Sequence, residues 1–279
     1  MIESVPYKIF EGRNESVMVG FGGRKLSAVE VSSYVLKYLR QMAEEALGQR
    51  IRKCVISVPA NFTDSQRSAT RISARLAGLE VIRIINEPTA AALAYGYIED
   101  MDRRIAVYDF GGGTFDVTIL EITQNVFEVL ATSGEMFLGG DDLDEAILAA
   151  MLAQFEEEHG VDLHKHPVAR ARLRSVAEEV KIELSETSQV SRYIEGVLPD
   201  QGKNLNFSLT ETALRDLIGP IVQRTVGGCE EAMKIAGIRR EQIDEIVLVG
   251  GTTRIPIVRE TVQAIFNRKP QTSINPMSV

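Results

Sequence analysis

The chain has 279 residues, of which 44% are hydrophobic and 25% charged, ordinary globular values that exclude wholesale disorder. With 31 Lys plus Arg against 39 Asp plus Glu, the formal net charge is −8, which argues against nucleic acid as the main partner. The longest wholly apolar run, residues 146–153, is far shorter than the ~20 residues of a membrane span, so we expect no membrane partner. Two cysteines, Cys54 and Cys229, are too few for a disulfide framework, and we expect two buried thiols in a cytoplasmic protein.

The chain begins with short segments that alternate weakly in hydropathy. Residues 7–10 and 16–19, with a turn at Gly22 and Gly23, predict a hairpin. A two-stranded hairpin is marginal by itself, so we expect that a preceding part of the fold is absent.

Apolar segments and helix-length segments then alternate. Residues 51–58 predict a buried strand, and residues 81–85 predict a second, short apolar strand. Thr63 is placed to cap a helix over residues 64–77, and Pro88 suits the first turn of an Ala-rich helix. Strand, helix, strand and helix in this order indicate an α/β unit.

The pattern changes after residue 102. Residues 104–110, 114–122 and 126–132 predict three consecutive strands joined by tight turns. The remaining elements, in chain order, are helices over residues 141–159 and 167–184, a hairpin of residues 190–198 and 205–209, a helix capped by Thr210, a break near Gly219 and Pro220, a second helix that ends at Gly237, a strand over 246–249 and a helix over 255–266.

The strongest motif is a run of three glycines, residues 111–113, between Asp109 and Asp116. Three glycines after an apolar strand allow a sharp turn that points N–H groups into one concavity, and such a concavity suits phosphate oxygens. Asp109, at the end of the strand, is placed to hold a metal-bound water, and Thr114 offers a hydroxyl at the same turn. The aspartate on each side favours a ligand site over a hairpin without one.

Three weaker motifs accompany this glycine run. Gly250 and Gly251, with Arg254, follow a buried strand and precede a helix, a pattern that fits an anion site and an ordinary loop equally well. Glu87 ends a buried strand at the usual ligand edge of an α/β sheet, although by itself a helix-entry carboxylate explains it better. Three residues share one face of a predicted helix and could grip ribose and adenine, although alone a solvated charged face explains them better: Glu178, Lys181 and Ser185.

Five segments occur in one order: residues 58–62, 84–91, 109–116, 138–142 and 247–251. Together they closely resemble the nucleotide-binding domain of DnaK-type heat-shock chaperones, the seventy-kilodalton heat-shock proteins, over nearly the whole chain. The resemblance implies an α/β fold of the actin-like (ribonuclease H-like) ATPase type, with two lobes around a cleft that holds Mg²⁺ and ATP or ADP. It divides the chain into lobe I, residues 1–100 (small subdomain 1–27, large subdomain 28–100), and lobe II, residues 101–279, with 139–218 as an inserted small subdomain.

The same resemblance implies a role for each motif. Glu87 and Asp109 would order the waters around Mg²⁺ and the attacking water, with Thr114 assisting. The residues that would bind the nucleotide are Gly111, Gly112, Gly113, Thr114, Gly140, Gly250, Gly251 and Arg254, together with Glu178, Lys181 and Ser185 as an adenosine clamp.

The implied function is ATP hydrolysis coupled to the binding and release of unfolded polypeptide by a separate peptide-binding domain. Arg83 and Asn86 match the place where the family meets its J-domain cochaperone, and a nucleotide exchange factor is a second implied partner. Pro59 and Arg67 match the pair that couples nucleotide state to the peptide-binding domain.

Two family features have no counterpart in the sequence. The family begins with a phosphate hairpin, Asp-x-Gly-Thr-Thr, and carries a phosphate-contacting lysine further on, so we expect an incomplete first lobe and crippled turnover. Met277 also stands where the family has an acidic residue. The alternative function is therefore a hydrolysis-deficient relative that binds nucleotide or a cochaperone. A third is an actin-like filament protein, against which the clamp residues and residues 84–89 argue.

Overall fold

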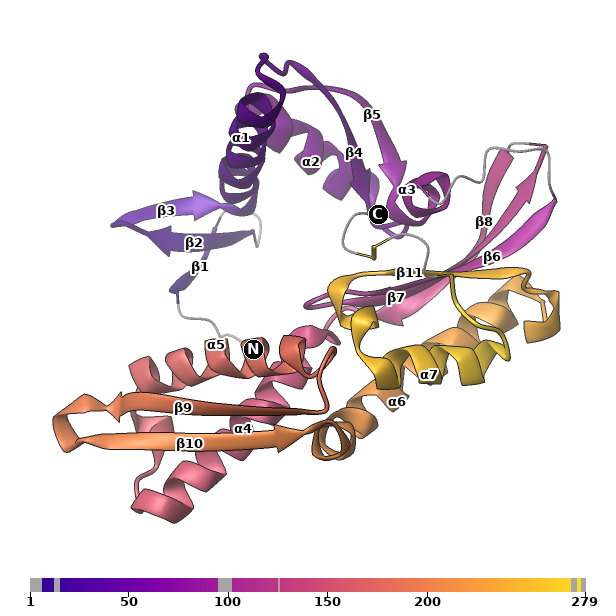
Figure 1. Cartoon of the computed structure of the whole chain (residues 1–279). Helices are drawn as coiled ribbons and strands as arrows, with labels where there is room; N and C mark the ends of the chain where they lie inside the picture. Colours follow the sequence, from indigo (N-terminus) through magenta and orange to yellow (C-terminus); the bar gives the residue numbers. More distant parts are fainter. Residues whose placement is uncertain (1–6, 13–15, 95–101, 125, 272–274, 277–279) are drawn as a thin grey trace. The chain divides into compact units, whose positions relative to one another are not determined.

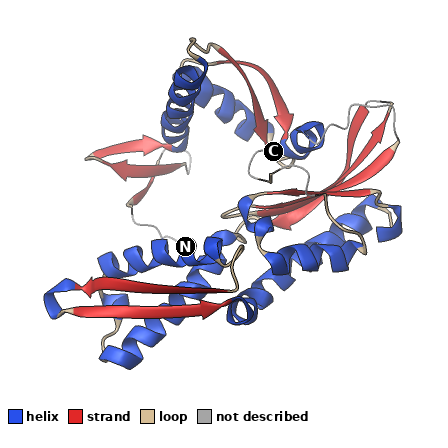
Figure 2. Cartoon of the chain, viewed as in Figure 1, coloured by secondary structure: helices blue, strands red, loops and turns tan. Residues whose placement is uncertain are grey.

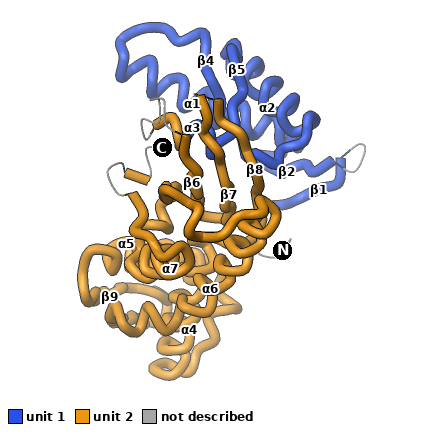
Figure 3. The backbone as a smooth tube through the Cα atoms, turned by 90° about the vertical axis from the view of Figure 1, so that its right-hand side faces the viewer, with its two compact units in different colours: residues 1–90 blue, residues 91–279 orange. Residues whose placement is uncertain are grey.

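The computed structural model describes residues 7–12, 16–94, 102–124, 126–271 and 275–276. Its packing divides the chain into two units, residues 1–90 and 91–279 (Figure 3). Over the described residues, no helix combines the length and the apolar character needed to cross a membrane.

The first unit opens with a three-stranded antiparallel sheet rather than the two-stranded hairpin expected. Strands β1 (Ile9–Glu11) and β2 (Val17–Phe21) pair as expected, and β3 (Arg24–Ser27) adds a third strand to β2. Gly22 and Gly23 have φ of 56° and 77°, the left-handed conformation that a tight hairpin turn requires. The third strand was missed because it is short and polar.

Helix α1 (Ala28–Leu47) was not predicted, although its start carries a clear local signal. Ser27 caps the helix: its hydroxyl accepts from the backbone N–H of Glu30, whose carboxylate accepts from the N–H of Ser27 at 2.8 Å. This reciprocal capping box is the S-x-x-E pattern, which is legible in the sequence.

The rest of the first unit follows the predicted order. Strands β4 (Lys53–Val58) and β5 (Glu80–Asn86) pair in parallel, and α2 (Asp64–Leu76) connects them. The hydroxyl of Thr63 caps α2 as expected. Helix α3 (Glu87–Ala94) begins directly at the end of β5. The prediction of a buried strand is wrong for β4, because Val58 is its one buried residue: alternate residues pack against a small apolar cluster and those between them are exposed. The expectation of two buried thiols is therefore wrong for Cys54, which is only partly buried, whereas Cys229 is buried.

The second unit is built on a four-stranded sheet in the order β11-β6-β7-β8. Strands β6 (Arg103–Phe110), β7 (Phe115–Thr123) and β8 (Val126–Glu135) form an antiparallel meander, and β11 (Glu245–Val249) lies parallel to β6. Figure 1 shows helices α6 (Glu211–Ala236) and α7 (Pro256–Phe266) along this sheet, where their apolar faces join the main core.

An α/β segment is inserted between β8 and α6. Helices α4 (Gly140–His159) and α5 (Pro167–Glu183) pack against a hairpin of β9 (Gln189–Leu198) and β10 (Lys203–Thr210), as Figure 2 shows. The predicted helices and hairpin are confirmed here. The segment matters for the site because α4 begins, and α5 ends, beside loops of the four-stranded sheet.

The predicted break at Gly219 and Pro220 is wrong. Helix α6 runs unbroken through both residues, with Pro220 inside it and exposed. A proline costs a helix about 3 kcal/mol through its missing N–H and its ring. Here Ile218 and Val222, two residues to either side of Pro220, are fully buried in the core, and this tertiary packing keeps the helix continuous.

Candidate functional site

Asp109 and Asp116 face each other near the end of the β6–β7 ladder. They are directly paired across the two antiparallel strands, so both side chains lie on the same face of the sheet. Burial raises the pKa of Asp109 to about 6, and the charge of Asp116 adds to this effect. Burial likewise raises the pKa of Asp116 to about 6. Two carboxylates held together in this way favour a hydrated divalent cation, which would offset their mutual repulsion.

This pair predicts a stability that depends on pH. A carboxyl whose pKa rises from 3.8 to about 6 on folding holds its proton more tightly in the folded state, so folding loses stability as pH rises through that window. In metal-free buffer we therefore expect Asp116→Asn to be more stable than the wild type at pH 7, by on the order of 2 kcal/mol, and to match it near pH 4. Urea unfolding at both pH values measures the difference, with Asp200→Asn in an exposed turn as the control. Equal stability of Asp116→Asn and wild type at pH 7 would contradict the prediction.

The glycine run forms a tight turn with an open outer side. The N–H of Gly111 donates to the carbonyl of Thr114 at 3.0 Å, which closes the turn. Gly112 and Gly113 are exposed, and their N–H groups donate to no other residue in the described part of the chain. A Cβ added at either glycine would meet nothing within 4 Å. These unused N–H groups can therefore donate to oxygens of a phosphate.

Two further segments pack against the inner side of this turn. The N–H of Gly140, at the start of α4, donates to the carbonyl of Gly111 at 2.9 Å, and the N–H of Asp141 donates to that of Gly112 at 2.7 Å. From the loop after β11, the hydroxyl of Thr252 donates to the carbonyl of Gly111 at 2.9 Å. The structure thus brings both predicted glycine turns and the start of α4 into one assembly.

Only glycine permits this close approach at two positions. A Cβ on Gly139 would lie 2.2 Å from the carbonyl oxygen of Gly112, and one on Gly250 would lie 2.4 Å from that of Phe110. Gly250 also has φ of 86°, in the left-handed region. We did not single out Gly139 as a site residue, because its role depends on a contact across the fold.

The three residues predicted as a clamp lie on α5 and the turn that follows it. Lys181 is buried, its ammonium lies 2.8 Å from Asp144 and donates to the carbonyl of Gly140 at 3.2 Å. Ser185 donates to the carbonyl of Lys181 at 3.2 Å, while Glu178 is exposed. The structure thus brings Lys181 to the glycine assembly through the carbonyl of Gly140.

Sequence reasoning missed Asp144, the partner of Lys181. Asp144 lies on the apolar stripe of α4 that includes Ile147, Leu148 and Met151, so helical periodicity places its carboxylate in the core. A buried carboxylate needs a charged or hydrogen-bonding partner, and this rule could have revealed the pair.

Glu87 belongs to the first unit, whereas the other predicted site residues belong to the second. It is the first residue of α3 and is half-buried. Nearby in that unit, the guanidinium of Arg67 donates to the side chain of Asn86 at 2.9 Å and to the carbonyls of Ala60 and Phe62, both at 3.1 Å. Arg83 is exposed on β5. The two proposed partner-facing regions of the first unit, around Arg67 and around Asn86, are therefore directly connected.

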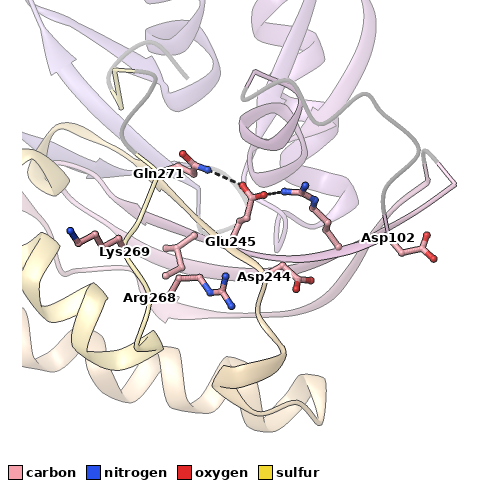
Figure 4. Close-up of a pocket in the computed structure, with 8 residues that line it drawn as sticks. Asp102, Asp244, Glu245, Arg268, Lys269 and Gln271 are labelled. Carbon is pink, nitrogen blue, oxygen red and sulfur yellow. Dashed lines mark hydrogen bonds and ion pairs between the residues drawn. The ribbon is translucent and has the colours of Figure 1, made fainter.

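A pocket of about 510 Å³ lies at the opposite end of the four-stranded sheet, where β6 and β11 begin (Figure 4). Glu245 pairs with Arg103 and accepts from Gln271 at 3.2 Å. Arg268 and Lys269 also line this pocket. The glycine turns follow the other ends of these strands, so this pocket is separate from the glycine assembly.

Among the described residues, no three His, Cys, Asp or Glu side chains gather as a metal site. The carboxylates of Asp109 and Asp116 nevertheless fit a Mg²⁺ ion, which keeps most of its waters and takes one or two carboxylates together with phosphate oxygens. The open N–H groups of Gly112 and Gly113 fit those phosphates.

Both units are α/β, and the candidate site is an anion cradle of glycine turns beside a carboxylate pair. A family model described as Hsp70 protein matches residues 1–279, and the chain therefore belongs to the Hsp70 family. This is a chaperone family with an ATPase domain of actin-like fold. Domains of this family generally bind ATP or ADP with Mg²⁺ and interact with cochaperones and nucleotide exchange factors.

Proposed function

We propose that this chain is the ATP-binding part of a DnaK-type chaperone, in which ATP hydrolysis controls the binding and release of unfolded polypeptide. The observation that carries the proposal is the glycine turn of residues 111–113. Its inner carbonyls accept hydrogen bonds from Gly140, Asp141 and Thr252, while the N–H groups of the exposed Gly112 and Gly113 donate to no other described residue. A turn braced in this way presents a rigid, preorganised set of donors to phosphate.

Each predicted residue has a task in this proposal. The N–H groups of Gly112 and Gly113 bind phosphate oxygens, and the hydroxyl of Thr114 donates to the same group. Asp109 and Glu87 orient water molecules, including the one that attacks the terminal phosphate. Mg²⁺, when bound, neutralises phosphate charge. The nucleoside lies toward Arg254, Ser185 and the other clamp residues, with Gly140, Gly250 and Gly251 lining the path between.

The proposal also covers organisation and partners. We assign residues 1–100 to lobe I and 101–279 to lobe II, with 139–218 as the inserted small subdomain. The region of Arg83 and Asn86 receives a J-domain cochaperone, lobe II receives a nucleotide exchange factor, and the protein acts in the cytoplasm.

Binding and hydrolysis measured separately test the proposal. We expect the purified protein to bind Mg²⁺-ADP with micromolar or tighter affinity by calorimetry. We expect single-turnover ATP hydrolysis to be slow in the wild type and about a hundredfold slower still in Asp109→Asn, because a preorganised polar group acts mainly in the transition state. We expect the substitution to change nucleotide affinity less than tenfold. Asp200→Asn, an equal charge change in an exposed turn, is the control.

The outcomes separate the candidate functions. Equal hydrolysis by Asp109→Asn and wild type would overturn the role of Asp109. Binding without any turnover in the wild type would instead support the hydrolysis-deficient relative. No nucleotide binding at all would leave only a cochaperone-binding role.

A further inference from the structure

The turn after α5 contacts the loop after β11 through one ion pair. A guanidinium nitrogen of Arg254 lies 3.1 Å from a carboxylate oxygen of Glu186, 68 positions away in the sequence. Glu186 belongs to the inserted segment, whereas Arg254 ends the short helix that follows β11. The pair therefore connects the inserted segment to the loop after β11 within the second unit.

Both ends of the ion pair have a fixed backbone. The N–H of Glu186 donates to the carbonyl of Glu183 at 3.0 Å, which continues the last turn of α5. On the other side, Thr252 holds the carbonyl of Gly111, and the N–H of Ile255 donates back to the carbonyl of Thr252 at 3.2 Å. The pair thus connects the end of α5 to the same loop that braces the glycine turn of residues 111–113.

The chemistry of the pair suits the edge of a nucleoside site. The side chains of Arg254 and Glu186 are 42% and 70% exposed, so the pair lies at the surface and can face a bound ligand. A guanidinium is planar and stacks on the face of a purine base, while its N–H groups remain free to donate in its plane. A carboxylate that accepts one of those N–H groups restricts rotation of the plane without covering its face. Ser185 precedes Glu186 directly, and Lys181 lies about one turn earlier.

We propose that Glu186 is a positioning residue. It holds the guanidinium of Arg254 in the orientation that stacks on the purine base of a bound nucleotide, and it thereby slows nucleotide dissociation. The inference rests on the proposed nucleotide site and adds to it a residue that the motifs did not include. Its ligand is a purine nucleotide, recognised through stacking.

The dissociation rate of a fluorescent ADP analogue, chased with excess ADP, tests this role. We expect Glu186→Gln to release the analogue about two- to fivefold faster than the wild type, the range that an exposed ion pair supports. Glu183→Gln is the matched control, because Glu183 ends the same helix and pairs with Arg192 of β9 instead. We expect the control to release the analogue at the wild-type rate.

Two further readouts exclude a merely structural effect. Glu186→Asp keeps the charge and should recover part of the slow release. Raising the salt concentration should accelerate release from the wild type more than from Glu186→Gln, because salt screens the exposed pair.

The possible failures are distinguishable. Unchanged or slower release by Glu186→Gln, with normal binding by the wild type, overturns this inference alone. No binding of the analogue by the wild type overturns the inference together with the proposed function.

Discussion

Replacing Lys181 with methionine is expected to lower the free energy of unfolding by about 3–5 kcal/mol, the cost of removing one partner from a buried ion pair. Lys181 and Asp144 are only 8% and 3% exposed, and the ammonium lies 2.8 Å from the carboxylate. Burial raises the pKa of Asp144 even though Lys181 opposes the shift. Without the ammonium, the core would hold an uncompensated carboxylate, and the carbonyl of Gly140 would lose the hydrogen bond from Lys181.

Urea unfolding without nucleotide, followed by far-ultraviolet circular dichroism, measures this loss. Adding Asp144→Asn to Lys181→Met should recover most of the stability, because it removes the stranded charge. The loss should also be smaller at pH 5 than at pH 7, since the lone carboxyl takes up a proton more readily at low pH. Arg174→Met, which breaks exposed pairs with Asp141 and Glu145, should cost less than about 1 kcal/mol. Additive losses in the Lys181→Met, Asp144→Asn double variant would show that the two residues are not coupled.

Gly139→Ala is expected to destabilise the site strongly although it adds only one methyl group. The added Cβ would lie 2.2–2.5 Å from three backbone atoms of Gly112 and Gly113, which no rotamer change can relieve. Either the start of α4 or the glycine turn of residues 111–113 must shift, so the two hydrogen bonds from Gly140 and Asp141 are distorted. Overpacking of this kind costs about 1–3 kcal/mol, and we expect the upper end of the range together with at least a tenfold loss of ADP affinity.

Gly113→Ala is the matched control for this substitution. Its Cβ would meet nothing within 4 Å, and the residue does not have a left-handed backbone. We expect Gly113→Ala to unfold at the wild-type urea concentration, within about 0.5 kcal/mol. If Gly139→Ala and Gly113→Ala proved equally stable, the close packing of α4 against the glycine turn would be contradicted.

Several elements could be predicted because their signals act over a few residues. Thr63 and Thr210 accept hydrogen bonds from the first turns of α2 and α6, as their positions before helical segments indicated. Helix α1 had an equally local signal in Ser27 and Glu30 that was not used. The helix break predicted at Pro220 is wrong because a non-local effect dominates there: packing of the neighbouring apolar residues outweighs the local cost of proline.

The site itself was only partly accessible from sequence. The glycine run and its flanking aspartates are contiguous, so their spacing alone indicates a turn with exposed N–H groups and a carboxylate pair. By contrast, the partners of Lys181 and Arg254 are Asp144 and Glu186, which come from other elements. The position of a lysine or arginine in the sequence does not indicate which carboxylate it pairs with, and the chain has 39 Asp and Glu residues.

Short patterns of glycine, caps and hydropathy were therefore enough to predict most of the strands and helices in their order, to predict the glycine turn and to indicate the family. Contacts across the fold explain why Gly139 must lack a side chain, why Lys181 pairs with Asp144 and how Thr252 braces Gly111. These contacts join residues separated by tens of positions or more. Packing of the sheet and helices selects them, since the burial of apolar surface that brings the segments together acts without regard to sequence distance.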